Sequence, residues 1–163
     1  LTYELVVFGS YLIMLGTREP LVYAAHTMGD IIFSLDVEAS RPCPAIAMKQ
    51  SNDEGELGIT IQEGRSTTRK ILLNLATYTH TSVALRDAVA MYEGPRVEVH
   101  LSNNYQRESF RQISLTAPVS SGAIVGFGAD SFLLGLDAVN RLLGRNGDRD
   151  HKLAGRDGGW KND

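Results

Sequence analysis

Short apolar runs alternate with stretches of helical periodicity along most of the chain. Five runs bounded by turn residues have the length and composition of β-strands, at residues 3–8, 45–50, 70–74, 96–101 and 122–127. Between and after them, apolar positions recur with helical spacing, which predicts helices at about 26–39, 54–65, 82–92 and 129–143 and a short one near 105–111. This alternation predicts a parallel sheet with helices on both faces.

The pattern changes after Gly144. Residues 145–163, RNGDRDHKLAGRDGGWKND, are polar, glycine-rich and mixed in charge, and such a segment cannot bury enough apolar surface to order itself. We therefore expect one domain over residues 1–144 and a disordered polar tail over 145–163. With five strands, the predicted domain is α/β, with a flavodoxin-like doubly wound parallel sheet. A chain of 163 residues, 43% of them hydrophobic, suits a single domain.

Charge and cysteine content narrow the class of protein. The chain has 16 basic and 19 acidic residues, so it lacks the positive excess of nucleic-acid-binding proteins. Cys43 is the only cysteine, which excludes an intrachain disulfide and fits a reducing compartment. No apolar run approaches the roughly 18 residues of a membrane span, and the first residues lack the features of a secretory signal. We expect a cytoplasmic protein that binds neither nucleic acid nor membranes.

Polar side chains gather where the predicted strands end. They are Arg18, Tyr23, Asn74, His80, Glu98, His100, Ser102 and Arg111. Because the carboxyl ends of parallel strands meet at one edge of the sheet, we expect these side chains to surround a ligand. Glu98 and His100 are two residues apart on one strand and so share a face. A carboxylate beside an imidazole orients it and favours its charged form, which makes His100 a candidate general acid.

The residues alone leave other interpretations open. His100 could be a structural histidine with Glu98 as its partner, Tyr23 a half-exposed aromatic side chain, and Asn74 a turn cap. A zinc site built from Glu98, His100 and His80 is a further alternative, although the H-E-x-x-H spacing is absent. The segment GFGAD lacks the third glycine of a dinucleotide-binding loop and follows the last strand.

Several longer motifs resemble one family. LGTREPLVY, QSNDEGEL, YTHTSVALRDA, VEVHLSN and GAIVGFGAD look like the type II 3-dehydroquinate dehydratases of the shikimate and quinate pathways, and the likeness runs from about residue 5 to 144. The resemblance implies a lyase that eliminates water from 3-dehydroquinate in the anti sense, through an enolate, to give 3-dehydroshikimate. It also implies a flavodoxin-like fold, a dodecamer built from trimers, and catalysis without cofactor, metal or Schiff base.

The resemblance also suggests a role for each matching residue. Tyr23 matches the base, and Arg18 in the same loop would lower the pKa of its phenol, which near 10 is too high for a base at neutral pH. His100, paired with Glu98, matches the acid that protonates the departing hydroxyl. Asn74 matches the residue that holds the enolate region through a bound water.

The implied substrate-binding groups hold the carboxylate and the ring hydroxyls. They are Asn74, His80, Leu101, Ser102 and Arg111, with backbone amides contributed by Leu101 and Ser102. Asp87, which we also include among the substrate-binding residues, resembles a residue that reaches the lid of a neighbouring subunit in the trimer.

The likeness breaks down in the loop after the first strand. The family typically has N-G-P-N-L-N there, whereas this chain has Phe8, Ser10, Tyr11 and Ile13 in place of the polar or turn-fixing residues. The asparagine replaced by Tyr11 helps to place the water that stabilises the enolate, and one such donor contributes about 2.7 to 4 kcal/mol. The sequence thus keeps an alternative open: a catalytically impaired or non-catalytic homologue that retains the fold and the oligomer.

Overall fold

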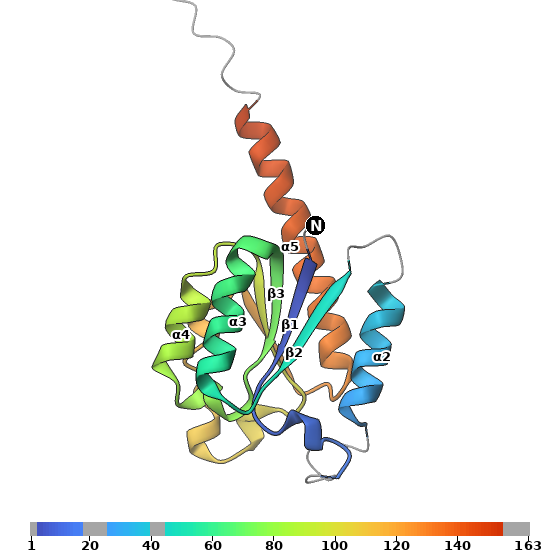
Figure 1. The fold of residues 1–163 in the computed structure, drawn as a ribbon, viewed down its shortest axis with the longest axis vertical. Helices are drawn as coiled ribbons and strands as arrows, with labels where there is room; N and C mark the ends of the chain where they lie inside the picture. The colour runs from blue at the N-terminus through green and yellow to red at the C-terminus, as the bar shows by residue number, and fades with distance from the viewer. Residues whose placement is uncertain (1–2, 18–25, 40–44, 155–163) are drawn as a thin grey trace, which may run out of the picture.

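A five-stranded parallel sheet forms the centre of the molecule. The computed structural model describes residues 3–17, 26–39 and 45–154, so Arg18, Tyr23 and Cys43 lie outside the described residues. The strands are β1 (Tyr3–Phe8), β2 (Ile46–Gln50), β3 (Thr68–Asn74), β4 (Arg96–His100) and β5 (Gly122–Val125). Their spatial order is β2-β1-β3-β4-β5, with every neighbouring pair parallel (Figure 1). This is the flavodoxin-like doubly wound order that the sequence predicts.

Helices cover both faces of the sheet. α3 (Glu54–Thr67) and α4 (Val83–Ala90) lie on one side, while α2 (Met28–Ala39) and α5 (Asp130–Ala154) lie on the other (Figure 1). Short 3₁₀ helices occupy the connecting loops: η1 (Leu12–Met14), η2 (Ala76–His80), η3 (Asn104–Gln106), η4 (Ser109–Arg111) and η5 (Ala117–Val119). Within the described ranges, no helix has both the length and the apolar character needed to cross a bilayer.

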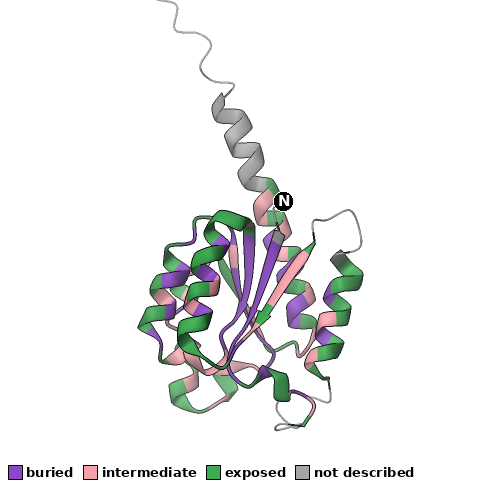
Figure 2. Ribbon diagram, in the orientation of Figure 1, coloured by how far each residue is buried: buried purple, intermediate pink, exposed green. Residues whose placement is uncertain are grey.

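The strand alternation builds two cores. Leu5 and Val7 of β1 pack in the cluster under α3 and α4, whereas Val6 and Phe8 pack under α2 and α5. The central strands are therefore buried on both faces, as the purple strands in Figure 2 show. Burial on both faces explains why these strands read as continuous apolar runs in the sequence.

The last helix differs from its prediction. The sequence predicts a helix that ends near residue 143, followed by a disordered tail, but α5 continues to Ala154. As described, α5 therefore includes residues 145–154 of the predicted tail, and residues 155–163 lie outside the described part of the chain. An isolated glycine does not end a helix by itself, because it costs only about 1 kcal/mol relative to alanine.

One ion pair is buried in the sheet, between β1 and β3. Glu4 and Lys70 are register neighbours on these strands, and Lys70 Nζ lies 3.0 Å from Glu4 Oε2. Both residues are at most 2% exposed. Lys70 Nζ also donates to Asn140 Oδ1 of α5. Burial raises the pKa of Glu4 above its ordinary value, and the lysine only partly opposes this effect.

Candidate active site

A hollow opens at the carboxyl ends of β1, β3 and β4. It holds about 510 Å³ of space, part of which is open to solvent. Six of the predicted site residues line it: Asn74, His80, His100, Leu101, Ser102 and Arg111. They follow two different strands, so it is the parallel sheet that brings them to one place.

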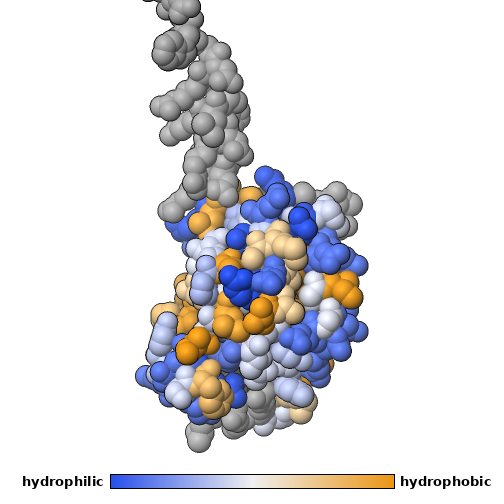
Figure 3. Space-filling model, turned by 90° about the vertical axis from the view of Figure 1, so that its left-hand side faces the viewer, coloured by the Kyte–Doolittle hydropathy of each residue, from blue (hydrophilic) through white to orange (hydrophobic). Residues whose placement is uncertain are grey.

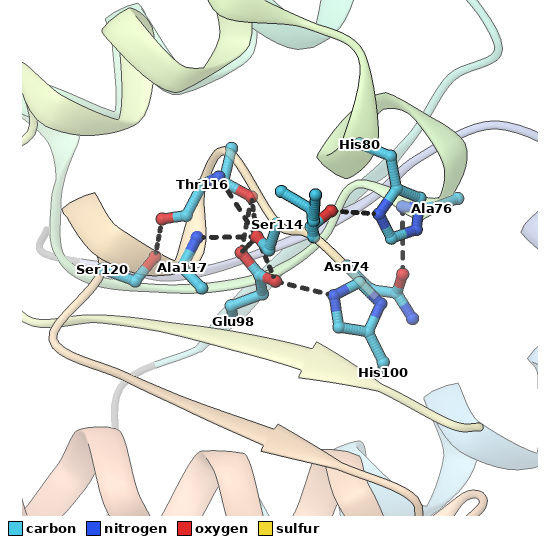
Figure 4. A network of polar contacts seen from close by, with 10 residues as sticks. Asn74, Ala76, His80, Glu98, His100, Ser114, Thr116, Ala117 and Ser120 are labelled. Carbon is cyan, nitrogen blue, oxygen red and sulfur yellow. Dashed lines mark hydrogen bonds and ion pairs between the residues drawn. The ribbon is translucent and has the colours of Figure 1, made fainter. Parts of the chain in front are cut away.

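Glu98 and His100 form a buried pair in β4. His100 Nε2 lies 2.7 Å from Glu98 Oε1, as the two-residue spacing predicts, and the two side chains are 7% and 2% exposed (Figure 4). Because an ionised carboxylate only accepts hydrogen bonds, Nε2 carries a proton and donates it. Nδ1 is therefore the ring nitrogen of His100 that remains for a ligand.

Two hydroxyls from a distant loop complete the surroundings of Glu98. Ser114 Oγ lies 2.9 and 3.1 Å from the two carboxylate oxygens, and Thr116 Oγ1 donates to Glu98 Oε2 at 2.5 Å (Figure 4). Burial alone would raise the pKa of Glu98, but the hydrogen bonds from His100, Thr116 and Ser114 outweigh it and hold the pKa below its ordinary value. Glu98 therefore stays ionised at neutral pH.

His80 faces His100 across the hollow, and the ring centroids are 6.3 Å apart. Its Nδ1 lies 2.7 Å from the carbonyl oxygen of Ile113, so this nitrogen must carry the proton. Burial lowers the pKa of His80, and the hydrogen bond to Ile113 only partly opposes this effect. The neutral ring then presents Nε2 as an acceptor, which suits a hydroxyl of a ligand.

Asn74 ends β3 and is 2% exposed. Its Oδ1 accepts the backbone N–H of Ala76 at 3.1 Å, which leaves the side-chain nitrogen as a donor at the wall of the hollow (Figure 4). This tight turn places Ala76 at a φ of 52°, a left-handed conformation that disfavours residues with a Cβ atom. The turn thus aims the amide group of Asn74 at some cost in backbone strain.

Arginine side chains form another wall. Arg107 and Arg111 both line the hollow, and the Nε atom of each lies 3.3 Å from Glu108 Oε2. Two guanidinium groups therefore border the hollow on this wall. It suits an anionic ligand such as a carboxylate.

The first loop takes a definite conformation despite its unusual sequence. Phe8 is fully buried and its ring packs against Phe132, with centroids 5.2 Å apart. Tyr11 is left-handed, with a φ of 61°, and 53% exposed, and its backbone N–H donates to Asn52 Oδ1 at 2.8 Å. Ser10 Oγ lies 2.8 Å from Thr77 Oγ1. Both Ser10 and Tyr11 line the hollow.

Not every predicted residue reaches this hollow. Asp87 lies on α4, is exposed, and pairs with Arg86 at 2.7 Å, away from the lining residues. Its expected contact with a neighbouring subunit remains a prediction. Arg18 and Tyr23 lie outside the described residues, so their roles also remain predictions.

Sequence reasoning missed other members of the site. They are Thr77, Arg107, Ser114 and Thr116. The segment RESFR, residues 107–111, contained a signal for Arg107, because it places a second arginine four residues before Arg111. Within the described ranges, no three His, Cys, Asp or Glu side chains are grouped as a metal site requires.

Comparisons with known proteins agree with this geometry. The family model "Dehydroquinase class II" matches residues 3–140. A 3-dehydroquinate dehydratase of Trichodesmium erythraeum is 46% identical over 144 residues, which cover 88% of this chain and 96% of that relative. One of Geotalea daltonii is 50% identical over 135 residues, which cover 83% of this chain and 94% of the relative.

Solved structures of dehydroquinases also match this chain. A type II dehydroquinase from Butyrivibrio crossotus matches with a TM-score of 0.83 at 35% identity, covering 85% of this chain and 97% of that one. A type II dehydroquinase from Propionibacterium acnes matches with a TM-score of 0.79 at 28% identity, covering 88% and 97%. From sequence and structure together, the chain belongs to the class II dehydroquinase family.

Proposed function

We propose that this chain is a type II 3-dehydroquinate dehydratase, a hydro-lyase that converts 3-dehydroquinate to 3-dehydroshikimate. The single observation that carries this proposal is the ionised Glu98 holding His100 at the wall of a cationic hollow. Relatives that this chain matches over 94% and 96% of their length carry that activity in their names. No feature of the described site favours the impaired alternative, since the Glu98–His100 pair, Asn74 and Arg111 are all in place.

The reaction removes a proton beside the ketone and then expels the hydroxyl from the carbon that carries the carboxylate. Tyr23 takes the proton as its phenolate, which Arg18 stabilises. The electron pair of the broken C–H bond moves to the ketone oxygen and forms the enolate. His100 donates the proton on Nδ1 to the departing hydroxyl, which leaves as water while the enolate collapses to the conjugated product. One proton passes from the substrate to Tyr23 and one from His100 to the departing hydroxyl, so the substrate loses one water and its charge is unchanged.

The remaining residues bind and orient the substrate. Arg111 and the amides of Leu101 and Ser102 hold its carboxylate, and His80 accepts a ring hydroxyl through Nε2. Asn74 donates toward the enolate region through its side-chain nitrogen. Support for these roles comes from the position of each group on the wall of the hollow.

The activity is tested by mixing purified protein with 3-dehydroquinate and following ultraviolet absorbance, because only the conjugated product absorbs strongly. We expect turnover by the wild type. The Tyr23→Phe variant should lose turnover while it still binds substrate. The turnover rate of Glu98→Gln should fall, because a neutral amide orients His100 less well. Glu63→Gln, an exposed glutamate of α3, is the matched control and should stay fully active. An inert wild type would refute the proposal.

We also infer a homo-oligomer of this chain in the cytoplasm, a dodecamer built from trimers. Large apolar side chains are exposed on α4 and around the β5–α5 connection: Val83, Met91, Phe127 and Leu134. On the face shown in Figure 3, hydrophobic surface is grouped around a hydrophilic centre. Exposed apolar surface of this kind commonly marks protein–protein contacts. Asp87 on α4 is exposed, and we infer that it meets a neighbouring subunit.

A further inference from the structure

Two hydroxyl groups meet on the wall of the hollow. Ser10, in the loop after β1, and Thr77, in η2 after β3, have their side-chain oxygens 2.8 Å apart. Both residues line the hollow, although Ser10 as a whole is only 2% exposed. A buried hydroxyl has few partners to choose from, so its hydrogen bonds can be counted.

One of the two hydroxyl hydrogens of this pair has no acceptor within the pair. Each hydroxyl carries one hydrogen, and the bond between Ser10 and Thr77 uses one of the two, whichever residue donates. Among the described residues, neither hydroxyl has a second hydrogen-bond partner. The remaining O–H is therefore available to an oxygen atom inside the hollow.

The pair lies directly beside Asn74. The N–H of Gly9, which precedes Ser10, donates to the carbonyl oxygen of Asn74 at 2.7 Å. The N–H of Ala76, which precedes Thr77, donates to Asn74 Oδ1 at 3.1 Å. These contacts hold the residues next to both hydroxyls against Asn74, and the contact from Ala76 also orients its amide group. The spare O–H and the Asn74 side-chain nitrogen are donors on one part of the wall.

We propose that the Ser10–Thr77 hydroxyl pair donates a hydrogen bond to the ketone oxygen of the substrate, the atom that becomes negative as the enolate forms. This inference rests on the proposed function. A donor fixed in place before the reaction stabilises developing charge without reorganisation. Because the negative charge on this oxygen is larger in the transition state than in the bound substrate, the pair raises kcat more than it lowers KM.

The test compares variants that keep or remove a hydroxyl at nearly constant shape. The double variant Ser10→Ala/Thr77→Val removes both hydroxyls, and we expect kcat to fall about tenfold to a hundredfold with KM changed by less than about threefold. Each single variant should lose less, because one hydroxyl remains but without the partner that orients it. Thr77→Ser keeps the hydroxyl and should remain within about twofold of the wild type.

The controls separate donation from packing and from failure of the parent proposal. Thr60→Val removes a hydroxyl that bonds within α3, outside the hollow, and should leave kcat unchanged. An inert wild type would refute the proposed function and this inference with it. If the wild type is active and the double variant has the same kcat, the role of the hydroxyl pair is refuted and the proposed function is not. Equal losses in Thr77→Ser and Thr77→Val, or a fall in thermal stability that matches the loss of rate, would show a packing role and also overturn the inference.

Discussion

The carboxylate of Glu98 is surrounded by donors from three other residues, His100, Ser114 and Thr116. Removing one of them should raise its pKa, because burial would then be opposed by fewer hydrogen bonds. We expect Thr116→Val to lower kcat about three- to tenfold by loosening His100. The acid limb of the pH–rate profile should move to higher pH, since Glu98 would lose its charge earlier as the pH falls.

Ser120→Ala is the matched control for that change. Ser120 Oγ donates to the carbonyl oxygen of Thr116 and does not touch Glu98. Its pH–rate profile should coincide with that of the wild type. A Thr116→Val profile that also coincides with the wild type would show that Thr116 does not act on Glu98 during catalysis.

Ala76 holds a left-handed backbone that glycine adopts without strain. We expect Ala76→Gly to stabilise the protein by about 1 kcal/mol, as measured by chemical denaturation. Ala84→Gly, at an exposed position of α4, should instead destabilise by about 1 kcal/mol, because there the glycine only adds backbone freedom to the unfolded chain. Destabilisation by both variants would contradict the strain at Ala76.

The sequence predicts some of these side-chain contacts and misses others for a physical reason. Glu98 and His100 are two residues apart, so strand geometry alone puts them on one face. Ser114 and Thr116 reach Glu98 from a loop 16 and 18 residues further along the chain. No periodicity encodes such a contact, because the path of the loop depends on tertiary packing. The Ser10–Thr77 hydrogen bond joins residues 67 positions apart, and the sequence does not predict it for the same reason.

Strands β1 and β3 share the buried Glu4–Lys70 pair, which offers a direct measure of what a buried charge costs. Lys70→Met should destabilise the protein by about 3 to 5 kcal/mol, because it leaves the carboxylate of Glu4 buried without its partner. Glu4→Leu/Lys70→Met should recover most of that loss. Urea denaturation measures both variants, and a double variant as unstable as the single one would contradict the account.

The strands and helices themselves were largely predictable. All five strands were predicted, within about two residues at each end, because the turn residues on either side of each apolar run mark where the strand begins and ends. The end of α5 was not. Residues 145–154 include Asn146, Gly147 and Asp148, which have low helix propensity, so neither composition nor propensity predicts that α5 continues to Ala154.

At the scale of the whole molecule, we expect copies of this chain to assemble. Apolar side chains on α4 and beside β5 would be covered in an oligomer. We expect light scattering to give a mass that is a multiple of three chains at micromolar concentration. If Asp87 acts on a neighbouring subunit, Asp87→Ala should reduce kcat without moving the residues that line the hollow of its own subunit. A monomer in solution would refute both expectations.

The backbone contact between the first loop and the loop after β3 also limits how the protein can evolve. A Cβ atom on Gly9 would lie 2.4 Å from the carbonyl of Leu75, so the two loops touch without room for a side chain. Substitutions can therefore accumulate on either side of Gly9, as at Phe8 and Ser10, while the glycine itself stays fixed. A new side chain in one loop must be matched by its neighbour in the other, as Ser10 is by Thr77. Lineages of this enzyme should thus change the two loops together, in paired steps around an invariant glycine.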